Sequence, residues 1–198
     1  MLKTDILIIG SGIAGLSYAV KTAKHFPDKK ITILTKVNTD ETNTKYAQGG
    51  IAVVNDAEHD SFDKHIEDTI IAGDGLCDKR IVEIVVKEGP GRVEEIIEWG
   101  ARFDKDATGE YLLGREGGHS EFRILHHKDI TGVEIERTLV AEVQKYPNIQ
   151  IYNHWFVLDI ITQHHLGFLV TKSTPDITCY GVYALNLQNN KIEGQKGG

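Results

Sequence analysis

The fold is decided by residues 5–19, which read DILIIGSGIAGLSYA. An apolar run from Ile6 to Ile9 leads into the spacing Gly-x-Gly-x-x-Gly, and a helical pattern follows. This order predicts a strand, a tight turn and the N-terminus of a helix. It therefore indicates an α/β fold with a parallel sheet, in which residues 6–9 form a central strand.

Each glycine of this stretch has a physical role in a dinucleotide site. Gly10 permits the turn, Gly12 lets the backbone approach a pyrophosphate, and Gly15 lets the helix pack closely on the strand. The phosphates would bind N–H groups at the positive end of the helix dipole. A Gly-rich turn with a purely structural role is the alternative, but the context on both sides favours the dinucleotide site.

A second strand is predicted over residues 31–35, after a helix over residues 13–25. Together these elements make a βαβ unit over residues 4–36. A nicotinamide-binding unit places Asp or Glu at the end of the second strand to bind the ribose. Lys36 stands there instead, and the nearest carboxylates, Asp40 and Glu41, follow several residues later. This weakens a simple NAD site and leaves room for a relative that binds its nucleotide differently.

Composition sets the class of protein and excludes several partners. The chain has 198 residues, 40% of them hydrophobic and 26% charged, with a net charge of −7, which fits a globular protein. No basic block, long apolar run or signal peptide is apparent, so nucleic acid and membranes are not expected partners. Cys77 and Cys179 lack metal-type spacing. We therefore expect reduced thiols, no metal site and a cytoplasmic location.

Two further stretches carry paired glycines. Residues 46–54 read YAQGGIAVV, which indicates either a backbone that approaches something large or flat, or an ordinary tight turn. Residues 114–120 read GREGGHS, and Arg123 and His126 follow. Charged groups on a glycine-bearing loop are typical of sites for small charged molecules. A solvated surface loop is the alternative.

Helices are predicted in the middle of the chain. One covers residues 62–72 after a cap at Asp60-Ser61. Residues 79–99 repeat apolar positions at helical spacing, and Gly89-Pro90-Gly91 is expected to split them into two helices. Gly100 should end the second helix, and its apolar positions 93, 96 and 97 should be core.

The C-terminal part predicts a helix over residues 131–145, a strand over 149–152 and an antiparallel meander over about 156–187. The meander is expected to use the runs 156–162, 167–171 and 178–187, with a solvated turn at His164-His165. Residues 194–198 look frayed. We expect a helical insert over about 61–146 and no linker between domains.

Three stretches in this order carry a family resemblance: residues 10–16, residues 46–52, and residues 115–120 followed by Arg123-Ile124-Leu125-His126. Together they resemble the L-aspartate oxidases, a branch of the succinate dehydrogenase and fumarate reductase flavoproteins. Ala-Gln-Gly-Gly is typical of the whole family, and Arg-Glu-Gly-Gly-His-Ser of this branch. The resemblance covers residues 5–187 and corresponds to the N-terminal part of such an enzyme.

The resemblance implies a Rossmann-like FAD-binding domain without its capping domain, and non-covalent FAD, because Asn43 stands where relatives carry a flavin-linked histidine. By resemblance, residues 11–14 bind the pyrophosphate, Lys36 lies beside the adenosine, residues 43–50 surround the flavin side, and Phe156 and Val157 contact the adenine end. The implied FAD-binding residues are Gly10, Ser11, Gly12, Ile13, Ala14, Gly15, Lys36, Asn43, Thr44, Lys45, Tyr46, Ala47, Gln48, Gly49, Gly50, Phe156 and Val157.

The implied reaction oxidises L-aspartate to iminoaspartate with oxygen or fumarate as acceptor, the first step of quinolinate and NAD biosynthesis. Quinolinate synthase is the implied partner. Glu116 matches the family's active-site glutamate, and a carboxylate there would attract the ammonium group that succinate lacks. The cationic residues and the Ala-Thr-Gly-Gly strand that follow in the family are absent here. The alternatives are an inactive flavin-binding fragment and a fumarate reductase-like or succinate dehydrogenase-like flavoprotein, and we expect the chain alone to be inactive.

Overall fold

The computed structural model describes residues 2–56 and 58–197, which form two compact units. The first unit combines the described residues up to Asn43 with those from Leu139 onward, and the second runs from Thr44 to Thr138. No helix among the described residues is long and apolar enough to cross a membrane.

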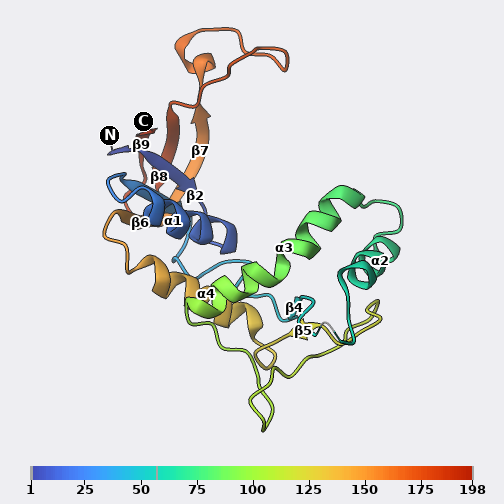
Figure 1. The fold of residues 1–198 in the computed structure, drawn as a ribbon. Helices are drawn as coiled ribbons and strands as arrows, with labels where there is room; N and C mark the ends of the chain where they lie inside the picture. The colour runs from blue at the N-terminus through green and yellow to red at the C-terminus, as the bar shows by residue number, and fades with distance from the viewer. Residues whose placement is uncertain (1, 57, 198) are drawn as a thin grey trace. The chain divides into compact units, whose positions relative to one another are not determined.

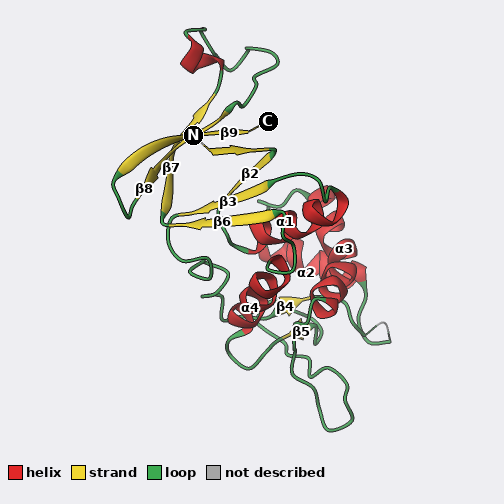
Figure 2. Cartoon of the chain, turned by 90° about the vertical axis from the view of Figure 1, so that its left-hand side faces the viewer, coloured by secondary structure: helices red, strands yellow, loops and turns green. Residues whose placement is uncertain are grey.

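The first unit contains a parallel sheet of three strands: β2 (Ile6–Ile9), β3 (Ile31–Thr35) and β6 (Ile149–Asn153) (Figure 2). Its order is β2-β3-β6, and Ile33 pairs with residue 8 on one side and residue 151 on the other. The parallel sheet is confirmed, but the central position predicted for residues 6–9 is wrong. The central strand is β3, all of whose residues are buried, because β6 pairs with its second edge.

Helix α1 (Ile13–His25) has the predicted bounds and packs on β2 and β3; Figure 1 shows it beside β2. Its buried residues, including Leu16, Ala19 and Val20, recur at helical spacing on one face. The helix ends before Pro27, where the backbone N–H of Phe26 donates to the carbonyl oxygen of Thr22.

The second sheet of this unit has the order β1-β9-β8-β7. Its strands are β1 (Leu2–Thr4), β7 (Trp155–Ile161), β8 (Gly181–Asn186) and β9 (Lys191–Gly197). Strands β7 and β8 form an antiparallel pair within the predicted meander, whereas β9 lies beyond its predicted end at residue 187. Strand β9 pairs with β8 as a third antiparallel strand and with β1 in parallel. Thr4 therefore belongs to this sheet and not to the parallel sheet.

Two predictions for the meander are wrong. Residues 167–171 form no strand, because a 3₁₀ helix, η1 (Gln163–Leu166), capped by Thr162 and ended by Gly167 at φ 88°, redirects the chain there. The segment between β7 and β8 extends beyond both strands (Figure 1). Residues 194–197, which were expected to fray, belong to β9, whose backbone pairs with β1 on one side and β8 on the other. Residue 198 lies outside the described part of the chain.

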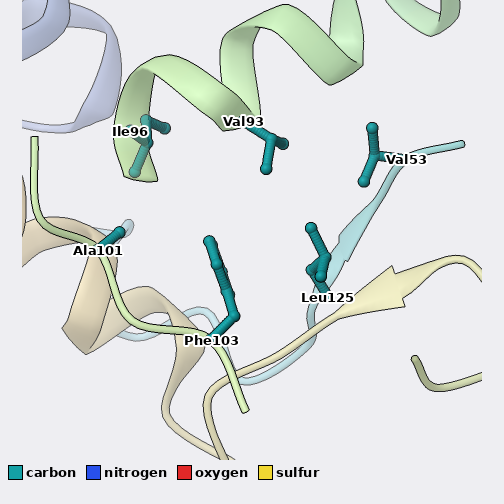
Figure 3. Close-up of a cluster of buried hydrophobic side chains, with 6 residues drawn as sticks. All are labelled: Val53, Val93, Ile96, Ala101, Phe103 and Leu125. Carbon is teal, nitrogen blue, oxygen red and sulfur yellow. The ribbon is translucent and has the colours of Figure 1, made fainter. Parts of the chain in front are cut away.

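The second unit contains a hydrophobic core between helices and a short strand pair. Its elements are β4 (Ile51–Ala52), α2 (Phe62–Ala72), α3 (Lys79–Glu98), β5 (Ile124–Leu125) and the start of α4 (Thr131–Val143). Figure 3 shows the buried cluster, to which α3 contributes Val93 and Ile96 and β5 contributes Leu125. The prediction that residues 93, 96 and 97 are core is confirmed, residue 97 being partly buried.

Helix α3 is continuous, so the predicted division at residues 89–91 is wrong. Pro90 lies inside the helix, where it lacks an N–H group to donate to the preceding turn. Buried side chains lie on both sides of it, Val86 before and Val93 after, and their burial holds the two halves in one helix. Gly100 follows the last residues with φ 105°, as expected for a C-terminal glycine.

Candidate functional site

The turn between β2 and α1 has the geometry that its glycines predict. Gly10 has φ 97°, a conformation that residues with a side chain rarely adopt. A Cβ atom on Gly15 would collide with the carbonyl oxygen of Gly10. Helix and turn therefore approach each other more closely than any other residue at position 15 would allow.

The N-terminus of α1 fits the phosphates of a dinucleotide. Its first helical hydrogen bond runs from the Leu16 N–H to the Gly12 carbonyl, and the N–H groups before it point out of the helix end. The N-cap residue, Gly12, has no side chain that could cap this terminus, and among the described residues no acidic side chain lies in the first turn of the helix. Backbone donors and the helix dipole can therefore act on an anion there.

Ser11, a predicted pyrophosphate-binding residue, uses its side chain within the protein. Its hydroxyl group is buried and lies 2.7 Å from the Thr39 carbonyl oxygen and 3.1 Å from the Thr35 hydroxyl oxygen. A hydroxyl group has one proton to donate. We therefore expect Ser11 to bind a phosphate through its backbone N–H, while its side chain fastens the turn to the segment after β3.

The predicted adenosine-binding residues of the first unit differ in their exposure. Lys36 directly follows β3 with an exposed side chain. Phe156 is 45% exposed, whereas Val157 packs against a buried cluster that includes Leu34 and Trp155. Adjacent side chains of a strand point to opposite faces. At most one of these two residues of β7 can therefore bring its side chain to a given ligand.

The predicted flavin-side residues belong mostly to the second unit. Residues 46–49 are exposed and can contact a ligand. Gly50 is different, because a Cβ atom there would collide with Ile124 and with the Leu125 carbonyl. The close approach of Gly50 is thus to the protein itself, at the β4–β5 pair.

The same stretch is fastened to the start of α4 by a glycine that the sequence did not single out. The Gly132 N–H donates to the Ala47 carbonyl oxygen at 3.0 Å. A Cβ atom on Gly132 would collide with the carbonyl oxygen of Thr44. The only signal in the sequence is a glycine in the first turn of a helix, where it is intrinsically unfavourable.

Glu116 lies at the start of a tight turn. The His119 N–H donates to the Glu116 carbonyl at 3.2 Å, and Gly118 has φ 88°, as a type II turn requires at this position. The side chain of Glu116 is exposed. Its Oε1 lies 3.7 Å from the point where a Cβ atom would stand if Gly49 had a side chain. The structure thus brings the glutamate of the Arg-Glu-Gly-Gly stretch to the Gln-Gly-Gly stretch.

Arg123, which the sequence suggests as a ligand-binding charge, is instead fully buried. Its Nε and Nη2 donate to the two carboxylate oxygens of Asp60 at 2.8 and 2.7 Å, and its Nη1 donates to Asp68. These contacts are the bidentate geometry that guanidinium and carboxylate groups favour. Arg123 therefore holds the protein together and is not available to a ligand.

Asp68 completes this cluster from α2. It accepts hydrogen bonds from the backbone N–H and the hydroxyl of Ser120, both at 2.8 Å. Burial by itself would raise the pKa of Asp68, but the bonds from Ser120 and Arg123 together lower that pKa to about 2. The carboxylate is therefore charged over the whole range in which the protein would work.

Asp60 and Asp68 were missed as site residues. The sequence contained one signal for them: Arg123 precedes the apolar pair Ile124-Leu125, and an arginine buried beside such a pair needs carboxylate partners. Of the predicted cap Asp60-Ser61, only Ser61 caps α2, where its hydroxyl accepts a hydrogen bond from the Lys64 N–H. The carboxylate of Asp60 binds Arg123 instead.

Comparison with known proteins gives consistent findings. A family model described as an FAD binding domain matches residues 5–196. The L-aspartate oxidase 2-a of Nicotiana tabacum is 45% identical over 188 residues, 95% of this chain and 27% of that protein. The L-aspartate oxidase of Yersinia pestis is 45% identical over 194 residues, 96% of this chain and 35% of that protein.

A solved structure agrees with these sequence relatives. A variant of the E. coli quinol fumarate reductase FrdA is similar with a TM-score of 0.87 and 30% identity, covering 100% of this chain and 32% of that one. The chain thus spans about a third or less of the length of these relatives.

Proposed function

We propose a function from one premise: the chain belongs to the FAD-binding domain family, and its cofactor is FAD. We propose that all 198 residues form the N-terminal part of the FAD-binding domain of an L-aspartate oxidase. The complete enzyme would oxidise L-aspartate to iminoaspartate, with oxygen or fumarate as acceptor. The product would pass to a quinolinate synthase in NAD biosynthesis.

The observation that carries this proposal is the place of Glu116. Its exposed carboxylate lies beside Gly49, in the stretch expected on the flavin side. A charged hydrogen bond from the substrate ammonium group to this carboxylate would place the amino acid there. FAD, when bound, supplies the acceptor for the two electrons that leave the Cα–N unit of L-aspartate.

A second candidate is reduction of fumarate by a succinate dehydrogenase-like or fumarate reductase-like flavoprotein. The similarity to the E. coli fumarate reductase favours it. Glu116 argues against it as the main reaction, because its carboxylate would attract an ammonium group, which succinate and fumarate lack.

The first test compares two proteins. One is the 198-residue chain alone, and the other, called here the joined enzyme, is this chain continued by the rest of the Yersinia pestis L-aspartate oxidase. With FAD and L-aspartate, the joined enzyme should release hydrogen peroxide and the chain alone should not. Turnover by the chain alone would contradict the proposal that the pocket needs the remaining length.

The second test replaces Glu116 by glutamine in the joined enzyme. The amide keeps the shape and removes the charge that pairs with the ammonium group. Losing one charged hydrogen bond costs about 1.5–3 kcal/mol, so L-aspartate oxidation should fall roughly tenfold to a hundredfold. Fumarate reduction should fall much less. Equal losses in both reactions would contradict a role for Glu116 in substrate choice.

FAD should be bound without a covalent bond, because the amide of Asn43 is no nucleophile towards the flavin methyl group. Acid precipitation of the joined enzyme should leave the yellow colour in the supernatant. A flavin that stays with the pellet would contradict this prediction.

A further inference from the structure

Residues 115–123, the Glu116 loop, are closed at their neck by backbone bonds. The Gly114 N–H donates to the Ile124 carbonyl at 2.9 Å, and the Arg123 and Ile124 N–H groups donate to the Gly114 carbonyl at 3.1 and 3.0 Å. Between these ends the loop has no helix or strand. The neck fixes where the loop starts and ends, but it leaves the direction of Glu116 to other contacts.

Those contacts come from α2 and the residues just before it. Asp68 accepts from the backbone N–H of Ser120, from its hydroxyl and from Arg123. Asp60 accepts twice from the same Arg123. Two carboxylates of one segment therefore bind the second half of the loop through five donated hydrogen bonds.

His119, which ends the turn that begins with Glu116, also lies against α2. The ring of His119 lies 6.1 Å from that of buried His65, in an edge-to-face arrangement. His119 donates its N–H to Glu116. A continuous path of contacts thus runs from α2 through residues 119 and 120 to the turn that begins with Glu116.

A buried ion cluster of this kind is poorly explained by stability alone. Taking Arg123 and two carboxylates out of water costs about as much as their attraction returns, and apolar residues would stabilise a loop as well. Its directional bonds, however, restrict the conformation of the loop. The arrangement therefore favours a role in geometry.

We propose that Asp68 is a positioning residue for Glu116: from α2 it orients the loop that presents this carboxylate to the substrate ammonium group. The inference rests on the function proposed above. It assigns a part of substrate selection to a residue that acts through Ser120 and Arg123.

The first measurement uses the 198-residue chain itself and needs no turnover. Amide hydrogen exchange is followed by mass spectrometry in the Glu116 loop and, as an internal reference, in β3. Asp68→Asn should speed exchange in the loop about tenfold and leave β3 unchanged. Ser120→Ala removes the hydroxyl that donates to Asp68 and accepts from Arg123 at 3.4 Å, but it keeps the backbone bond to Asp68 and the Asp68–Arg123 pair, and should give a smaller change of the same kind.

The matched control breaks another contact between the same helix and the same loop. Lys64 binds Glu121 at 2.6 Å, but this pair is partly exposed. Lys64→Met should therefore leave the exchange of the loop within about twofold of the parent. Equal exchange in the parent and Asp68→Asn, or an equal effect of Lys64→Met, would overturn the proposal.

The second measurement tests substrate choice in the joined enzyme. Asp68→Asn should lower the ratio of L-aspartate oxidation to fumarate reduction on the order of tenfold, mainly through the KM for L-aspartate. In a Glu116→Gln background the same change should leave the ratio unaltered, because the group that Asp68 positions is gone. A general loss of stability would lower both reactions together and would not depend on Glu116.

The outcomes separate the two hypotheses. If Glu116→Gln itself leaves the ratio unchanged, the proposed role of Glu116 in substrate choice is wrong, and the positioning role of Asp68 is wrong with it. If Glu116→Gln lowers the ratio and Asp68→Asn does not, the function stands and the positioning role of Asp68 is wrong.

Discussion

The β2–α1 turn and the Glu116 loop are the two regions for which we propose contact with a ligand, and they are built in opposite ways. In the turn, the backbone conformation and the close approach of the helix depend on Gly10 and Gly15, which lie within a few residues of each other, although the Ser11 side chain also binds the segment after β3. In the loop, Arg123 binds Asp60, which is 63 residues away, and Asp68, which is 55 residues away. The first site is thus local in sequence, and the second depends on a distant helix.

This difference affects how each region should fail. The turn depends on the absence of side chains, so adding one methyl group should disturb it. The loop depends on matched buried charges, so removing one partner leaves another charge buried and unpaired. Three substitutions or conditions test this contrast.

The largest effect is expected from Arg123→Met. It leaves the buried Asp60 carboxylate without its cation, which costs about 3–5 kcal/mol. Urea unfolding of the 198-residue chain, followed by the fluorescence of Trp99 in the second unit, measures the loss. Glu121→Gln, which breaks only the partly exposed pair with Lys64, should cost less than about 1 kcal/mol. Similar losses in both variants would contradict the contrast.

A smaller loss is expected from Gly15→Ala. The added Cβ would collide with the Gly10 carbonyl oxygen, which belongs to the backbone and cannot move cheaply, so we expect a cost of about 3 kcal/mol and weaker FAD binding. Gly91→Ala is the control, because Gly91 lies inside α3 with open space at its Cβ position. That change should stabilise the helix by about 0.5–1 kcal/mol. FAD titration and urea unfolding measure both variants.

The smallest expected effect is the pH dependence of the stabilisation that the charged Asp68 side chain gives to the folded state. Burial opposes its charge, but the Ser120 and Arg123 bonds lower the pKa to about 2 from the usual 3.8. Because the folded pKa lies below the unfolded one, the stabilisation is full above about pH 4 and is lost as pH falls towards 2. The contribution is on the order of 2 kcal/mol.

Urea unfolding at pH 5 and near pH 2 measures this dependence as the difference in the free energy of unfolding between the parent and Asp68→Asn. The difference should shrink as the pH falls. Asp63→Asn removes an exposed carboxylate from the same helix and is the control. A parent–Asp68→Asn difference that stays constant with pH would mean that the Asp68 charge does not stabilise the loop.

Local patterns predicted the elements that local physics controls. The bounds of α1, β3 and α2 follow from apolar periodicity, from the residues before Pro27 and from the Ser61 cap. The continuity of α3 through Pro90 was not predictable in this way, because it depends on buried contacts at Val86 and Val93. Strand β9 was missed for the same reason, since only its neighbours β1 and β8 make its polar sequence a strand.

The sequence alone determined the geometry of the β2–α1 turn and singled out the two other glycine-bearing stretches, because a glycine spacing prescribes backbone conformation directly. Only the tertiary structure decided that β3 is the central strand, that Gly50 and Gly132 serve internal packing, and that Arg123 is buried between Asp60 and Asp68. Pairing, close approach and burial all depend on residues far apart in the chain. No local pattern specifies which distant partner will meet a given residue.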